Sequence, residues 1–134
     1  MGFTVLIVDD SSIIRTMVKR SISMADIEVT QCIEASNGVE ALEILDKEWV
    51  DIVFVDLNMP VMGGTELVER MAADNLLVSI PVVIVSADQD SARIEDLRRR
   101  GIRAYIKKPF RPENFRDAVN ELLLKDSGKK TRTK

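Results

Sequence analysis

The sequence of 134 residues contains no histidine and a single cysteine, Cys32. The absence of histidine excludes every catalytic triad with an imidazole base, every histidine-ligated metal site and any role as a phosphohistidine donor. One cysteine excludes an internal disulfide and a four-cysteine zinc site, so Cys32 is most simply a small strand residue.

Long hydrophobic runs are also missing. No stretch approaches the roughly 20 apolar residues of a membrane-spanning helix. The first ten residues, MGFTVLIVDD, lack the basic segment of a secretory signal, and Leu6 stands where a myristoylation signal has serine or threonine. We therefore expect a cytoplasmic protein without membrane attachment.

Charge is distributed unevenly along the chain, and its C-terminus is basic. Nineteen basic and 22 acidic residues give a net charge of −3, which argues against non-specific nucleic-acid binding over the whole surface. Residues 126–134 hold four basic residues and one acidic residue, which predicts a disordered basic tail after a single domain at 1–125. No helix-turn-helix fits after residue 125, so direct DNA binding is not expected.

Apolar runs alternate with segments of helical periodicity along this domain. The pattern predicts strands at 5–8, 29–35, 52–55, 81–85 and 104–107, and helices that include 13–22, 39–45, 67–71, 90–100 and 112–123. Alternation of this kind is typical of a doubly wound α/β fold, in which a parallel sheet is covered on both faces.

Polar residues stand where the apolar runs end. Asp9 and Asp10 follow the first run, Asp56 the third, Ser86 the fourth and Lys108 the fifth. The carboxyl ends of parallel strands share one edge, where doubly wound folds bind ligands. Clustered carboxylates favour a hard cation such as Mg²⁺. A metal, a carboxylate nucleophile and a lysine are what phosphoryl transfer to aspartate requires.

Four segments together resemble the receiver domain of two-component response regulators, most closely the single-domain CheY type. They are Asp9-Asp10 after an apolar strand, Asp56 in VDLNMPVMGG, Ser86 in PVVIVSA and Lys108 in AYIKKPF. The resemblance covers residues 3–125 and implies a flavodoxin-like sheet of strand order 2-1-3-4-5 with five helices.

The resemblance also implies the site roles. Asp56 would accept a phosphoryl group from the phosphohistidine of a sensor histidine kinase. Mg²⁺ would be ligated by Asp10, Asp56 and the backbone carbonyl of Asn58, and by Asp9 through water.

Lys108 would pair with Asp56 and later with a phosphoryl oxygen, and a cis bond would join Lys108 to Pro109. Ser86 and Tyr105 would form the switch pair, with a serine that lacks the methyl group of the commoner threonine and so a less sharply two-state switch.

Simpler interpretations stand beside these. Alone, Asp9 and Asp10 also fit an acidic pair that complements a helix dipole. Ser86 also fits the start of a loop, and Tyr105 an ordinary strand residue. A basic cluster late in the domain fits either a solvated face or a docking site for an acidic partner; it comprises Arg98, Arg99, Arg100 and Arg103.

The sequence therefore predicts a signalling protein that catalyses only its own phosphorylation and dephosphorylation. Phosphorylation would make it dock on a downstream protein such as a flagellar motor switch protein. An alternative is a phosphorelay intermediate that passes the group to a histidine phosphotransfer protein. An aspartyl-phosphate phosphohydrolase is disfavoured, because Asn58 stands where such enzymes carry an acidic proton donor and no cap domain fits the length.

Overall fold

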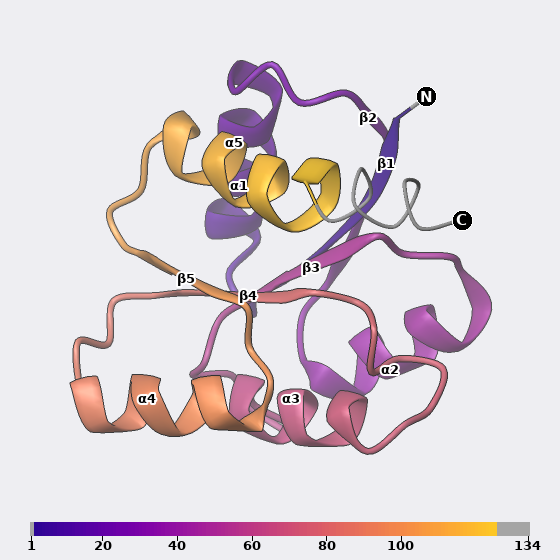
Figure 1. The fold of residues 1–134 in the computed structure, drawn as a ribbon, viewed down its shortest axis with the longest axis vertical. Coiled ribbons are helices and arrows are strands. Elements are labelled where there is room, and N and C mark those ends of the chain that lie inside the picture. The colour runs from indigo at the N-terminus through magenta and orange to yellow at the C-terminus, as the bar shows by residue number, and fades with distance from the viewer. Residues whose placement is uncertain (1, 126–134) are drawn as a thin grey trace.

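Five parallel strands form one sheet in the computed structural model, which describes residues 2–125. In chain order they are β1 (Phe3–Val8), β2 (Val29–Ala35), β3 (Ile52–Val55), β4 (Val82–Ser86) and β5 (Ala104–Lys107). Their spatial order is β2-β1-β3-β4-β5 (Figure 1). This confirms the predicted doubly wound sheet, whose order reverses between β1 and β3.

Five α-helices cover the two faces of the sheet. They are α1 (Ser12–Met24), α2 (Gly38–Lys47), α3 (Gly64–Ala72), α4 (Ser91–Arg100) and α5 (Pro112–Val119). Figure 1 shows α1 and α5 on one face and α2, α3 and α4 on the other. The last predicted helix differs in detail, because the chain continues after α5 as the π-helix η1 (Asn120–Lys125). Leu122 and Leu123, which lie in this segment, are both buried.

Side chains cap the N-termini of α1 and α2 by accepting hydrogen bonds from backbone N–H groups of the first turn. The Ser11 hydroxyl accepts from the backbone N–H of Ile14, and the Asn37 side chain accepts from that of Glu40. Such side chains satisfy amide groups that have no partner inside the helix. Gly101 ends α4 at φ 121°, a conformation that side chains with a Cβ rarely adopt.

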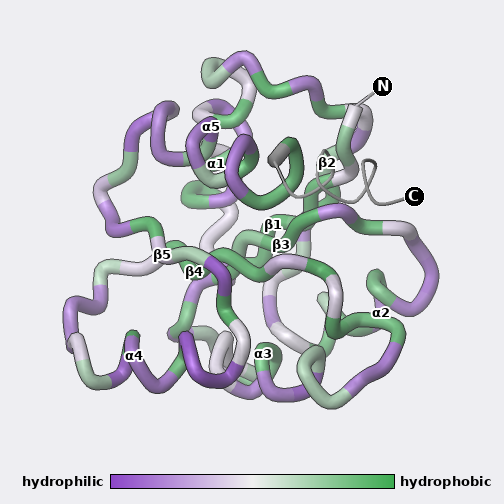
Figure 2. Tube along the Cα trace, in the orientation of Figure 1, coloured by the Kyte–Doolittle hydropathy of each residue, from purple (hydrophilic) through white to green (hydrophobic). Residues whose placement is uncertain are grey.

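The core lies on both faces of the two central strands. All four residues of β3 are buried, and successive side chains point to opposite faces. Val53 and Val55 pack with the α2–α4 layer, whereas Phe54 packs edge-on against Phe115 of α5 with ring centroids 5.2 Å apart. Figure 2 shows the hydrophobic residues concentrated along β1 and β3 at the centre of the molecule.

One further expectation is confirmed by the described backbone. The peptide bond between Lys108 and Pro109 is cis, as predicted. No helix within residues 2–125 is long and apolar enough to cross a membrane. The basic tail expected at 126–134 lies outside the described residues.

Candidate functional site

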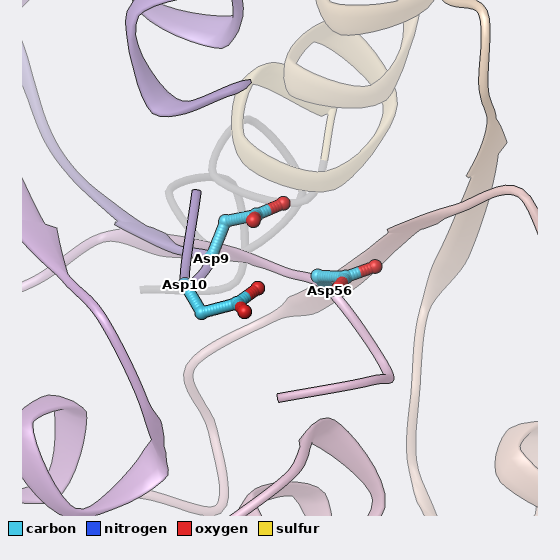
Figure 3. Close-up of side chains that lie close together, drawn as sticks. All are labelled: Asp9, Asp10 and Asp56. Atoms are coloured by element: carbon cyan, nitrogen blue, oxygen red, sulfur yellow. The ribbon is translucent and has the colours of Figure 1, made fainter. Parts of the chain in front are cut away.

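Three carboxylates meet at the carboxyl edge of the sheet. Asp9 and Asp10 follow β1, and Asp56 follows the neighbouring strand β3. The backbone N–H of Asp56 donates to the carbonyl of Val8 over 2.9 Å, which fixes the two strand ends side by side. One carboxylate oxygen from each aspartate lies within 4.8 Å of the others. Figure 3 shows Asp9 and Asp10 projecting from the end of β1 toward the side on which Asp56 lies.

Lys108 contributes the ammonium group that faces this cluster. Its backbone N–H donates to the carbonyl of Ser86 over 2.9 Å, which ties the end of β5 to the end of β4. Its Nζ lies 3.2 Å from Asp9 Oδ2 and 3.5 Å from Asp56 Oδ1. One ammonium therefore contacts two of the three carboxylates, and the cluster keeps an excess of negative charge.

Burial, like the excess negative charge, disfavours ionisation of these carboxyl groups. Asp9 is 4% and Asp56 8% exposed to solvent. Burial raises the pKa of Asp56; the charge of Lys108 opposes this rise and the charge of Asp9 adds to it. Additional positive charge would stabilise the ionised carboxylates.

The donor set suits a hard divalent cation. All three side chains offer carboxylate oxygens, the type of ligand that Mg²⁺ prefers. The backbone N–H of Asn58 donates a hydrogen bond to the Asp56 carboxylate, which places residue 58 beside the cluster. The residues present therefore fit Mg²⁺.

Ser86 ends β4, and Tyr105 lies in the neighbouring strand β5. Ser86 is 1% exposed, and its hydroxyl accepts from the backbone N–H of Asp88 over 3.2 Å. The Tyr105 hydroxyl donates to the backbone carbonyl of Asp88 and, at 3.4 Å, to that of Ser86. Both residues thus contact the loop between β4 and α4.

Two arginines in this region were not singled out from the sequence. Arg93 Nη1 lies 2.7 Å from the Asp88 carboxylate and holds the same loop. Arg15 of α1 donates from Nη1 to the backbone carbonyl of Asp9 over 2.6 Å. A basic residue six positions after Asp9 is the only sequence signal for the second contact, and it does not identify the acceptor.

The basic cluster near α4 divides into two kinds of residue. Arg100 forms ion pairs with Asp96, at 2.9 Å, and with Glu69 of α3. Arg98 and Arg99 are exposed and form no ion pair within the part of the chain that the structure describes. Cys32 lies in β2, away from the cluster, and burial raises the pKa of its thiol to about 11.

Comparison with known proteins gives a consistent result. Residues 5–120 match the response regulator receiver domain family. The chain is 34% identical over 119 residues to chemotaxis protein CheY1 of Helicobacter pylori, covering 88% of this chain and 94% of the relative. It is also 34% identical over 119 residues to CheY-3 of Vibrio cholerae, with 89% and 90% covered.

The fold has solved counterparts as well. The structure of chemotaxis response regulator CheY4 of Vibrio cholerae superimposes with a TM-score of 0.81 at 28% identity. The match covers 92% of this chain and 100% of that one.

Proposed function

Because the chain belongs to the response regulator receiver domain family, we propose that Asp56 is the residue that accepts a phosphoryl group from a phosphohistidine of a sensor kinase. One observation carries this assignment. Asp56 follows β3, with Asp9 and Asp10 after β1 on one side and Ser86 at the end of β4 on the other. A group on Asp56 therefore lies between the acidic cluster and the hydroxyl.

Asp9 is less suited to accept the group, although it also faces Lys108. Its Oδ1 accepts from the backbone N–H of Ser11 over 2.9 Å, and its Oδ2 faces the ammonium at 3.2 Å. Both oxygens are thus engaged in holding the turn and the lysine. The contact of Asp56 Oδ1 with Lys108 is longer, at 3.5 Å, and its carboxylate also accepts a hydrogen bond from the Asn58 N–H, so the assignment rests on the place of Asp56 between the acidic cluster and Ser86.

The reaction is an in-line displacement. A carboxylate oxygen of Asp56 forms the new bond to phosphorus while the bond from phosphorus to the histidine nitrogen breaks, and the imidazole leaves with the electron pair. Lys108 moves from the carboxylates to a phosphoryl oxygen and offsets its charge. Asp10, Asp56 and the Asn58 carbonyl would hold Mg²⁺, with Asp9 acting through water. The ion would supply further positive charge at the phosphoryl oxygens.

Ser86 and Tyr105 would transmit the change. The Ser86 hydroxyl accepts a hydrogen bond from the Asp88 amide, so its own proton is available to a phosphoryl oxygen. Movement of Ser86 toward Asp56 would stretch that bond and displace the Asp88 backbone, to which the Tyr105 hydroxyl is bound. The loop between β4 and α4 would then change shape and present a different docking surface.

Labelling with a small phosphodonor tests the acceptor. With Mg²⁺ and acetyl phosphate, the wild type should gain one phosphoryl group by intact-mass spectrometry, and Asp56→Asn should gain none. Asp51→Asn is the matched control, because Asp51 precedes β3 and its carboxylate accepts from the Thr4 amide at the opposite edge. Full labelling of Asp56→Asn would contradict the assignment.

The names of the relatives support a role in chemotaxis. We infer that the phosphorylated form docks on a flagellar motor switch protein. Binding of this target should increase when the chain carries a phosphoryl mimic such as beryllofluoride, and Asp56→Asn should show no increase. If the phosphorylated chain instead transfers its group to a histidine phosphotransfer protein and ignores the switch protein, it is a phosphorelay intermediate.

A further inference from the structure

Arg15 joins three parts of the molecule at the rim of the acidic cluster. It lies in the second turn of α1, and its side chain is 17% exposed. Its Nε donates to Glu34 Oε1 of β2 over 2.8 Å, and its Nη1 donates to the backbone carbonyl of Asp9 over 2.6 Å. The rigid guanidinium plane thus bridges the edge strand and the turn that follows β1.

The carbonyl that Arg15 binds belongs to the peptide between Asp9 and Asp10. The Asp9 side chain is held independently, by the Ser11 amide and by Lys108. The Asp10 carboxylate is exposed, and within residues 2–125 no hydrogen bond or ion pair holds it. Within these residues, no bond from another group sets its direction toward Asp56, visible in Figure 3, so the orientation of its backbone, which fixes where the side chain starts, is the constraint that the structure supplies.

We propose that Arg15 is a positioning residue: it fixes the plane of the Asp9–Asp10 peptide and so aims the Asp10 carboxylate into the metal site. The inference rests on the proposed function, because it concerns binding of Mg²⁺ by the same cluster. Glu34 has an indirect role, since it accepts a hydrogen bond from Arg15 Nε and so orients the guanidinium. The hydrogen bond from Arg15 in turn lowers the pKa of Glu34 and keeps this carboxylate ionised.

The charge of Arg15 and its hydrogen bond to the Asp9 carbonyl predict opposite changes in Mg²⁺ affinity when the side chain is removed. Removing a cation near three carboxylates should strengthen Mg²⁺ binding by electrostatics alone. Releasing the Asp9–Asp10 peptide should weaken it, because a ligand that must be ordered on binding lowers affinity. Groups that orient metal ligands typically change affinity by about 10–100-fold. The sign of the effect therefore separates positioning from charge.

Lys19 provides a matched control. It lies one turn after Arg15 on α1 and binds the same carboxylate, with Nζ 3.1 Å from Glu34 Oε2. The structure shows no contact between Lys19 and Asp9 among the described residues. Lys19→Ala thus removes a cation and an ion pair with Glu34 but leaves the bond to the Asp9 carbonyl.

The test is calorimetric titration with Mg²⁺ alone, well below each variant's melting temperature. Arg15→Ala should bind Mg²⁺ about tenfold more weakly than the wild type. Lys19→Ala should stay within about twofold, and Arg15→Lys should remain weak because one ammonium cannot reproduce the fork. Labelling of Asp56 in Arg15→Ala should recover at saturating Mg²⁺.

Several outcomes would overturn the inference. Tighter Mg²⁺ binding by Arg15→Ala would show that Arg15 acts on the metal only through its charge. Equal binding would show that Arg15 does not affect the metal site. Full rescue by Arg15→Lys would show that one ammonium donor is sufficient and would overturn the role given to the guanidinium fork and to Glu34. A lower melting temperature with unchanged Mg²⁺ affinity would make the contact purely structural. If the wild type itself binds no Mg²⁺, the metal site of the proposed function fails first, and this inference with it.

Discussion

The two edges of the sheet differ sharply in charge and in shape. The carboxyl edge holds buried Asp9 and Asp56 with Lys108 as the facing cation. The amino edge holds a hollow of about 580 Å³, and two side chains of its lining are among the most exposed apolar ones, Trp49 at 82% and Leu76 at 86%.

The hollow and the acidic cluster thus lie at opposite edges of the sheet. At the amino edge, Asp51 accepts hydrogen bonds from the Thr4 amide at 2.8 Å and from the Trp49 indole at 3.1 Å, so local donors satisfy its charge. At the carboxyl edge, one ammonium faces a cluster of three carboxylates. We expect a reaction where carboxylate charge is not compensated by nearby donors or cations, and the cluster at the carboxyl edge carries such charge.

The largest expected difference between the edges is the response to Mg²⁺. A metal that binds only the folded state at 100 times its Kd stabilises that state by about 2.7 kcal/mol. The melting temperature of the wild type should therefore rise by several degrees, and Asp10→Ala should abolish the rise. Asp46→Ala, which removes a carboxylate from the amino-edge hollow, should retain it. If the melting temperature of the wild type does not change with Mg²⁺, the two edges do not differ in metal binding.

A smaller effect is expected from Asp56→Asn in metal-free buffer. The folded-state pKa of Asp56 lies above its ordinary value of 3.8, so ionisation costs the folded state more than the unfolded state. The contribution of Asp56 to wild-type stability is therefore most favourable below that value and becomes less favourable as pH rises through the folded-state pKa. Asp56→Asn should therefore melt a few degrees higher near neutral pH.

This gain should vanish as the pH falls below the ordinary value, because the wild-type carboxyl is then protonated in both states. Melting curves from neutral to acidic pH, recorded for both proteins, measure it. The amino edge supplies the contrast: Asp51→Asn should not stabilise, since it weakens two satisfied hydrogen bonds. A gain for Asp56→Asn that persists at low pH would have a cause other than charge.

Trp49→Ala should change the free energy of unfolding by less than about 0.5 kcal/mol, the usual range for surface substitutions. The indole is 82% exposed, and Asp51 keeps its bond from Thr4. Urea denaturation monitored by circular dichroism measures the change. A loss of several kcal/mol would show that the hollow is part of the core.

The smallest expected effect is on the fluorescence of Trp49. It lies seven residues before Asp56, with β3 between them, so at ~3.3 Å per residue it is on the order of 20 Å from the acidic cluster. Its emission should stay constant while Mg²⁺ is added under conditions in which calorimetry detects binding. Strong quenching would mean that the two edges communicate.

The sequence by itself determined the order of elements and the residues at the end of each strand. Apolar runs and helical periodicity are local properties, and they placed β3 at 52–55 and the start of α5 at Pro112. A parallel sheet brings all carboxyl ends to one edge, so Asp9, Asp56 and Ser86 could be assigned to one site in advance. The turn to π geometry at Asn120 was not predicted, because apolar spacing alone does not distinguish the two helix types.

Only the tertiary structure decided which partners these residues have. Arg15 and Glu34 are 19 residues apart, and Lys108 is 99 residues from Asp9 and 52 from Asp56. Their contacts depend on how α1, β2 and β5 pack around the central strands. No local pattern specifies that an arginine of α1 binds the backbone carbonyl of Asp9. Every residue has a backbone carbonyl, so the residue type does not reveal which one accepts the hydrogen bond.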